Sequence, residues 1–160
     1  TLYPVSDEQV HQLGFPNYYF ERFNNGELEN CTAWHHAIAH SLHGYGGIAA
    51  NGADVIRFYE ALMTGNIVSE ASLDEMRQWV QGKQSTEPDY GLGLEYYEYI
   101  KGVPTYGHEG DNLGGTTQIL YIPSKDTYVF ISINAGRQLF GQYLFRTSDA
   151  KIEVCRFLSK

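Results

Sequence analysis

The sequence predicts an α+β fold of the α/β sandwich type, in which an antiparallel sheet meander is flanked by helices. Residues 51–81 carry apolar side chains at the three- and four-residue spacing of helices, whereas residues 90–134 alternate at the two-residue spacing of strands. A further amphipathic stretch at residues 146–159 closes the chain. Helices on either side of a run of strands are typical of α+β domains.

Composition limits the domain number and the partners. A chain of 160 residues that is 42% hydrophobic fits one domain with a real core. Its formal net charge of -8 opposes binding to nucleic acid or anionic lipid. The two cysteines, Cys31 and Cys155, lack the spacing of a metal or redox motif and are expected as buried thiols. No apolar run reaches the roughly 18 residues of a membrane span, and the first residues lack the pattern of a signal peptide.

The first half of the chain is expected to hold loops and then two helices. Turn signals at "FPN", "NNG" and "GYGG" make residues 1–50 loop-rich. Asn51 is placed to cap a helix that Gly65 can close. A second helix is expected to start at Ser72, with Glu75 three positions on, and to face its apolar residues inward, namely Leu73, Met76, Trp79 and Val80.

The second half is expected to form the sheet. The alternating runs are "YGLGLEYYEYI", "TYGHEG", "TTQILYIP" and "TYVFISIN", with turns at "KGVP" and "PSKD". The last run is apolar on both faces, which predicts a central strand covered on both sides. The terminal helix is expected to bury Ile152, Leu158 and either Val154 or Cys155.

Histidines gather in "HHAIAHSLH", where His36, His40 and His43 suggest a zinc site on one helical face. The cluster holds no Asp, Glu or Cys as a further ligand, and "HGYGG" ends any helix at His43. Histidines packed on aromatic rings or exposed to solvent are the alternative. We therefore predict no metal site and no cofactor.

Two short strings imitate motifs of penicillin-interacting serine enzymes, namely "SDAK" (Ser148 and Lys151) and "SIN" (Ser132 and Asn134). Ser148 opens a terminal helix of mixed charge rather than a buried one, and Ser132 lies within a strand pattern. Neither serine is expected to be a nucleophile.

The stretch "YGHEGDNLGG" holds the strongest candidate site. His108 lies on a predicted strand between two glycines, where backbone can approach a ligand closely. A histidine titrates near neutrality and suits proton transfer, and the Asp111 amide is placed to donate to an oxyanion. A tight β-bend with exposed His and Glu side chains is the alternative that the residues alone leave open.

Three stretches resemble, in order, the C-terminal part of the serine β-lactamase and D-alanyl-D-alanine carboxypeptidase superfamily, in its class C-like branch. They are residues 32–76 from "TAWHH" to "LDEM", then "YGLGL", then "YGHEGDNLGGTTQILYIPSKDTYVFISIN". The resemblance covers roughly residues 12–134. It implies a β-lactamase/transpeptidase-like fold and acyl transfer to or hydrolysis of an ester, amide or peptide bond through a serine.

The resemblance also implies site residues. His108 takes the place of the Lys or His of the K-T-G or H-x-G triad, Gly110 its glycine, and Asp111 supplies the oxyanion amide. Tyr106, Glu109 and Asn112 are expected to bind substrate. Glu109 replaces a hydroxyl of penicillin-binding members, which shifts the expected substrates toward neutral esters, amides or positively charged peptides.

The S-x-x-K and Y-x-N motifs precede this region in the family and do not appear here. The chain is therefore expected to be the C-terminal segment of a larger hydrolase. Its expected partners are a small-molecule or peptide substrate and the missing N-terminal half of the fold. Self-association through an exposed sheet or swapped elements is expected. The family implies a location outside the cytoplasm. A non-catalytic ligand-binding domain of the same fold is the alternative function.

Overall fold

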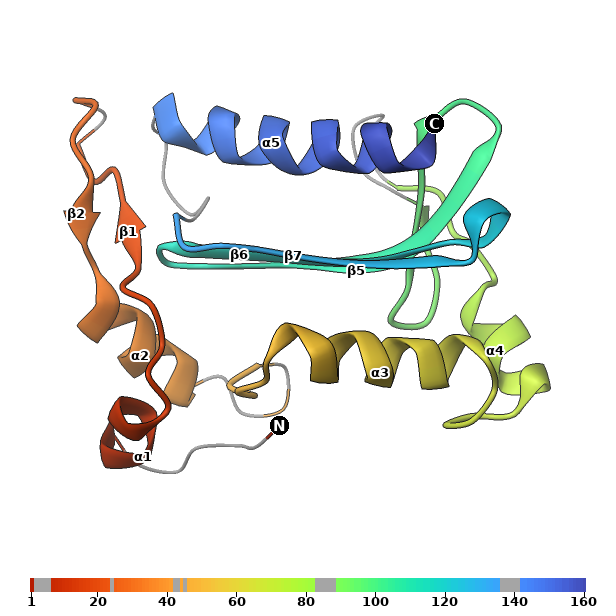
Figure 1. Ribbon diagram of the computed structural model, residues 1–160, viewed down its shortest axis with the longest axis horizontal. Helices are drawn as coiled ribbons and strands as arrows, with labels where there is room; N and C mark the ends of the chain where they lie inside the picture. The colour runs from red at the N-terminus through yellow and green to blue at the C-terminus, as the bar shows by residue number, and fades with distance from the viewer. Residues whose placement is uncertain (2–6, 24, 42–43, 45, 83–88, 136–141) are drawn as a thin grey trace. The chain divides into compact units, whose positions relative to one another are not determined.

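The structure is a computed structural model that describes residues 1, 7–23, 25–41, 44, 46–82, 89–135 and 142–160, without the side chains of residues 7, 11, 40 and 142–149. The helices are α1 (Asp7–Gln12), α2 (Thr32–Ser41), α3 (Gly52–Met63), α4 (Glu70–Met76) and α5 (Gln142–Ser159), with a short 3₁₀ turn η1 (Pro123–Lys125). The strands are β1 (Tyr19–Phe20), β2 (Glu29–Asn30), β3 (Asp89–Tyr90), β4 (Glu95–Ile100), β5 (Val103–Asn112), β6 (Gly115–Ile122) and β7 (Thr127–Ile133) (Figure 1). None of these helices is both long and apolar enough to cross a membrane.

The main sheet has five strands in the order β3-β4-β5-β6-β7, and β1 pairs with β2 in a separate two-stranded sheet. Strand β3 pairs with β4, and β4 pairs with β5, in antiparallel register. Only two residues join β5 to β6, a connection that antiparallel neighbours alone can use. Helices with an antiparallel sheet confirm the predicted α+β class.

The described chain forms two compact units. The first comprises residues 1–51, 110–117 and 132–151, and the second comprises residues 52–109, 118–131 and 152–160. Each unit buries one cysteine thiol, Cys31 in the first and Cys155 in the second. The main sheet contributes strand segments to both units, so each unit is described by itself.

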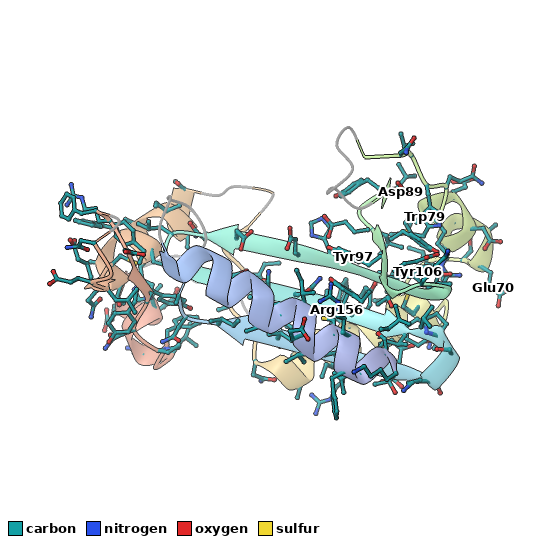
Figure 2. The ribbon with its side chains drawn as sticks, turned by 90° about the horizontal axis from the view of Figure 1, so that it is seen from above. Glu70, Trp79, Asp89, Tyr97, Tyr106 and Arg156 are labelled. Carbon is teal, nitrogen blue, oxygen red and sulfur yellow. The ribbon has the colours of Figure 1, made fainter. Side chains whose placement is uncertain are left out.

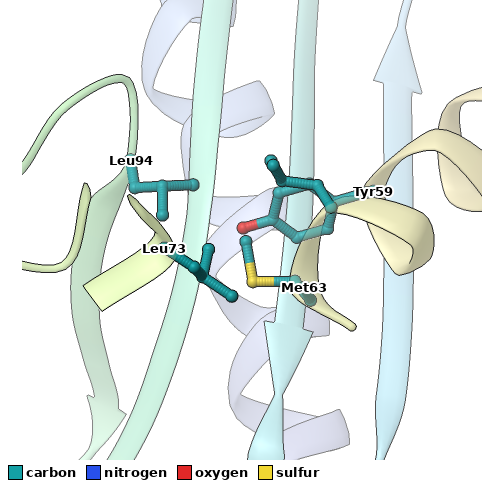
Figure 3. Packing of buried hydrophobic residues seen from close by; sticks show 5 residues of the cluster. Tyr59, Met63, Leu73 and Leu94 are labelled. Carbon is teal, nitrogen blue, oxygen red and sulfur yellow. The ribbon is translucent and has the colours of Figure 1, made fainter. Parts of the chain in front are cut away.

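In the second unit, α3 lies on one face of the strands and the end of α5 lies on the other (Figure 1). The core on the α3 side consists of Tyr59, Leu62, Met63, Leu73 and Leu94. Figure 3 shows Tyr59 and Met63 of α3 close to Leu73 of α4 and to Leu94, which lies just before β4. On the other side, the Cys155 Sγ lies 3.8 Å from Gln118 Oε1. Burial of this apolar set, at about 25 cal/mol per Å², is the main stabilising contribution of the unit.

Helix α3 ends as the sequence predicts. Gly65 has a positive φ of 75°, and its N–H donates to the Leu62 carbonyl at 3.2 Å. The Asn66 N–H donates to the Ala61 carbonyl at 2.8 Å. This pair of bonds is the Schellman motif, which satisfies carbonyls at the helix end.

The prediction for the second helix was wrong at both ends. Helix α4 begins at Glu70, and Ser69 is its N-cap, since the Ser69 side chain accepts from the Ser72 N–H. The helix stops at Met76, so Val80 does not face inward; it is 71% exposed and pairs with Tyr90 in a β-bridge. Ser69 provides the cap because it is extended, whereas Ser72 already lies inside the first turn.

The prediction that the last strand is central was also wrong for the described sheet, because β7 stands last in the strand order. Its two apolar faces have another cause. Tyr128 stacks on Tyr121 and meets Tyr59 edge-on, while Phe130 lies within van der Waals reach of Gly52 at the start of α3. Tyr128 and Phe130 both lie on the α3 face, and the end of α5 lies on the other face (Figure 1). Helical cover therefore explains the apolar pattern without a second neighbouring strand.

In the first unit, α2 lies within the region expected to be rich in loops. The Thr32 N–H donates to Asn30 Oδ1 at 3.0 Å, and the Cys31 carbonyl accepts from the His35 N–H at 2.8 Å. These bonds start the helix with an asparagine turn that the sequence pattern did not reveal.

Candidate active site

All six predicted site residues lie on β5. Tyr106, His108 and Glu109 belong to the second unit, and Gly110, Asp111 and Asn112 belong to the first. Strand β4 pairs with β5 only as far as Glu95, opposite Gly107. The C-terminal half of β5 therefore extends past its last pair with β4.

His108 is exposed, and both of its ring nitrogens have partners. Nε2 lies 2.8 Å from the hydroxyl of Tyr90, and Nδ1 lies 2.5 Å from the carbonyl oxygen of Glu109. The two rings meet edge-on, with centroids 5.7 Å apart. Tyr90 is a site residue that the sequence analysis missed, because it precedes His108 by 18 positions and only the fold brings the two together.

Tyr106 belongs to an aromatic cluster with Trp79 and Tyr96. Its ring stacks on Trp79 with centroids 5.6 Å apart, and the guanidinium carbon of Arg77 lies 5.4 Å from the Tyr106 centroid. Tyr96 lies 6.0 Å from Tyr106 and 5.5 Å from Trp79. Figure 2 labels Trp79 and Tyr106 among the side chains of the second unit. The structure thus gives Tyr106 packing partners in addition to the substrate contact expected of it.

Glu109 is held through its backbone. Its N–H donates to the carboxylate of Glu95 at 2.9 Å, and Glu95, only 8% exposed, also accepts from the Tyr97 hydroxyl. The pKa of Tyr97 is raised above its ordinary value. Burial is the largest cause, the hydrogen bond to Glu95 comes next, and the charge of Glu109 contributes less. Side chains alternate along a strand, so the Glu109 carboxylate lies on the face of Tyr97, opposite to His108.

Gly107 lies against the neighbouring strand β6. A Cβ at Gly107 would lie 2.1 Å from the carbonyl oxygen of Ile119 and 2.6 Å from the Leu120 Cδ2 on β6. The sequence analysis attributed the glycines around His108 to the approach of a ligand. At Gly107 the close approach is that of β6.

The predicted residues of the first unit lie at the end of β5. Asn112 Oδ1 accepts from the Leu113 N–H at 2.7 Å, and Thr117 Oγ1 donates to the Gly110 carbonyl at 3.4 Å. Backbone N–H groups two residues apart point to the same strand edge, so the Asp111 N–H faces the edge that the Glu109 N–H faces. The role of the Asp111 N–H as an oxyanion donor stays a prediction.

The turn after β5 is anchored by His35 in the first unit. His35 Nδ1 lies 2.6 Å from the Leu113 carbonyl oxygen, and the ring stacks on Tyr18 with centroids 3.6 Å apart and planes within 6°. Burial is the main cause that lowers the pKa of His35; the Leu113 carbonyl opposes this shift and the charge of His36 adds to it.

We expect the free energy of unfolding to decrease as the pH decreases, because of the lowered pKa of His35. The folded pKa lies below the unfolded value of about 6.5, so the unfolded state binds more protons on acidification. The contribution of His35 is full above about pH 7 and is lost as the pH drops from about 6.5 to the folded pKa. Urea unfolding at pH 8 and pH 5.5 checks this, with His35→Asn as the non-titrating comparison. The slope with pH should be shallower in His35→Asn, and equal slopes would contradict the assignment.

Of the three histidines in the proposed zinc cluster, His36 alone has a described side chain. The His36 ring lies among Phe15, Tyr18 and His35, with centroids 5.9, 6.1 and 6.0 Å away. No three His, Cys, Asp or Glu side chains of the described part come together as metal ligands. The side chain of His40 and all of residue 43 lie outside the described residues.

In the two strings that imitate serine-enzyme motifs, Lys151 and Asn134 make hydrogen bonds to other parts of the chain. Lys151 is 3% exposed and its Nζ donates to Thr116 Oγ1 at 2.8 Å, while the side chain of Ser148 lies outside the described residues. In "SIN", the Asn134 side chain donates to the Asn17 carbonyl at 2.8 Å, and the Asn134 carbonyl accepts from the Tyr19 N–H at 3.0 Å. Asn134 therefore ties β7 to the N-terminal residues.

Comparison with known proteins supplies a family and a fold. The family model described as "Beta-lactamase" matches residues 5–145. Among solved structures, the chain is similar to a D-stereospecific amidohydrolase from Streptomyces sp., with a TM-score of 0.63 and 24% sequence identity. The similarity covers 76% of this chain and 35% of that one, so the chain spans about a third of that protein's length.

Proposed function

The chain belongs to the beta-lactamase family of serine hydrolases, and on that premise we propose that β5 forms one wall of an acyl-transfer site whose nucleophilic serine lies outside residues 1–160. The reaction is hydrolysis or transfer at an ester, amide or peptide bond. The serine attacks the carbonyl, an acyl-enzyme forms, and water or another acceptor releases the acyl group.

The observation that carries the proposal is the placement of His108. It is solvent-exposed on a strand that continues past its last pair with β4, while its ring nitrogens hold fixed partners. An exposed imidazole on a rigid strand suits proton transfer, and the Asp111 N–H on the edge beyond β4 suits an oxyanion.

The proposal extends to substrate and location. Esterase, carboxypeptidase-like and penicillin-binding activities share the same acyl chemistry, and the candidate substrate contacts are Tyr106, Asn112 and the strand backbone. The Glu109 carboxylate lies on the face of β5 opposite to His108. We therefore propose no role for the Glu109 charge in substrate selection. We place the working enzyme outside the cytoplasm and include self-association through the β7 edge of the sheet.

A fluorophosphonate probe tests the proposal. We expect the intact protein that contains residues 1–160 to take up one label at a serine of an S-x-x-K motif outside these residues, and residues 1–160 alone to take up none. Peptide mapping by mass spectrometry identifies the labelled residue. Label on Ser148 that Ser148→Ala removes would place the nucleophile in α5, and an intact protein that resists every serine probe would point to a non-catalytic binding domain.

A further inference from the structure

Tyr90 on β3 and His108 on β5 form a pair of exposed side chains in contact. Tyr90 pairs with Glu95 on β4, and Glu95 pairs with Gly107 on β5, so the three backbones stand in one row across the sheet. Two further bonds fix Tyr90 from its other side, since Val80 and Tyr90 exchange N–H to carbonyl bonds of 2.8 and 2.9 Å. These pairings fix the backbone of Tyr90, and the contact with His108 is made by the side chains, with the Tyr90 hydroxyl 2.8 Å from Nε2.

The hydrogen-bond partners define where the protons lie. A peptide carbonyl only accepts, so the 2.5 Å contact with Glu109 requires that Nδ1 carries a hydrogen. In the neutral ring, Nε2 is then the acceptor, and the Tyr90 hydroxyl at 2.8 Å is the donor. Both distances lie at or close to the normal range of hydrogen bonds.

Packing does not account for this pair. His108 is exposed and Tyr90 is 42% exposed, so their contact buries little apolar surface. Ordering two exposed side chains costs conformational entropy that apolar burial does not offset here. What the arrangement achieves is an imidazole with one orientation and one tautomer.

We propose that Tyr90 is a positioning residue for His108, which holds the ring as the Nδ1–H tautomer with the Nε2 lone pair directed at the Tyr90 hydroxyl. Its role in turnover rests on the proposed acyl-transfer function. A fixed imidazole needs no reorganisation when charge develops at the site, which is how second residues commonly support a general acid or base.

The ring nitrogens of His108 give the first test, and it requires no activity. In ¹⁵N-histidine-labelled protein at a pH where the rings are neutral, we expect His108 to show a protonated Nδ1 and a lone-pair Nε2. Tyr90→Phe should shift the Nε2 resonance. Tyr121→Phe, which removes another hydroxyl of the same sheet that donates to Asp126 at 3.3 Å, should leave it in place. A protonated Nε2 in the unsubstituted protein, or an Nε2 shift unchanged in Tyr90→Phe, would overturn the proposal.

A double-mutant cycle gives the second test, in the intact enzyme. We expect Tyr90→Phe to lower kcat by about tenfold with little change in KM, a size within the usual coupling of residues in contact. Tyr90→Phe combined with His108→Ala should be no slower than His108→Ala alone. Independent, multiplying effects would overturn the positioning role. If His108→Ala keeps full activity, the proposed function fails, and the nitrogen spectrum still decides the pairing.

Discussion

His108→Ala in the intact enzyme is expected to lower kcat by about 100-fold or more, the usual scale for loss of one acid–base group. The imidazole is exposed on β5 and held by Tyr90 and the Glu109 carbonyl, so its removal takes away the titrating group and leaves the strand intact. Steady-state kinetics on an ester reporter, with kcat and KM measured separately, check this result.

Stability separates a chemical effect from a structural one. Because His108 is exposed, His108→Ala should unfold at nearly the same urea concentration as the unsubstituted protein. Added imidazole should restore part of the lost rate. A variant with unchanged kcat would show that His108 takes no part in the reaction, and a variant that loses rate and stability together would show that the histidine supports the fold.

Gly107→Ala is expected to lower the free energy of unfolding by about 3 kcal/mol, the upper end of the cost of overpacking. The added Cβ would meet the Ile119 carbonyl oxygen at 2.1 Å, a contact with backbone that no rotamer change relieves. Strands β5 and β6 would have to separate next to His108. Urea denaturation followed by circular dichroism measures the change.

Gly110→Ala is the matched control on the same strand. Its Cβ would meet only the Thr117 Oγ1 at 3.2 Å, and neither glycine has a positive φ. A hydroxyl can turn away, so the expected loss is below about 1 kcal/mol. Equal losses for the two variants would contradict the close approach of β6 to Gly107.

Local patterns predicted much of the second unit. Helix α3 and its end at Gly65 follow from apolar spacing and a glycine that adopts positive φ, and alternation gave the strands. The errors come from choices that the pattern leaves open. Ser69 and Ser72 are both good caps, and only the backbone shows that Ser69 is the extended residue. The apolar faces of β7 reflect helical cover, which alternation cannot distinguish from a central position.

The candidate site was predicted only in part. His108 stood out through its glycine-rich surroundings, and its place on β5 agrees with the predicted strand. Its partner Tyr90 and the Glu95 carboxylate that holds the Glu109 N–H come from β3 and β4, and no spacing rule links them to His108. Contacts between strands depend on register, which the alternating pattern alone does not fix.

The burial of one cysteine thiol in each compact unit offers a way to measure how the units open. Cys31 is 2% exposed and Cys155 is 1% exposed, so neither sulfur can react with an alkylating reagent until its surroundings open. The two reaction rates, followed by mass spectrometry under mild conditions, would report the opening of each unit separately. Matching rates would indicate that the units open as one cooperative body, and a faster rate at one cysteine would identify the unit that opens first.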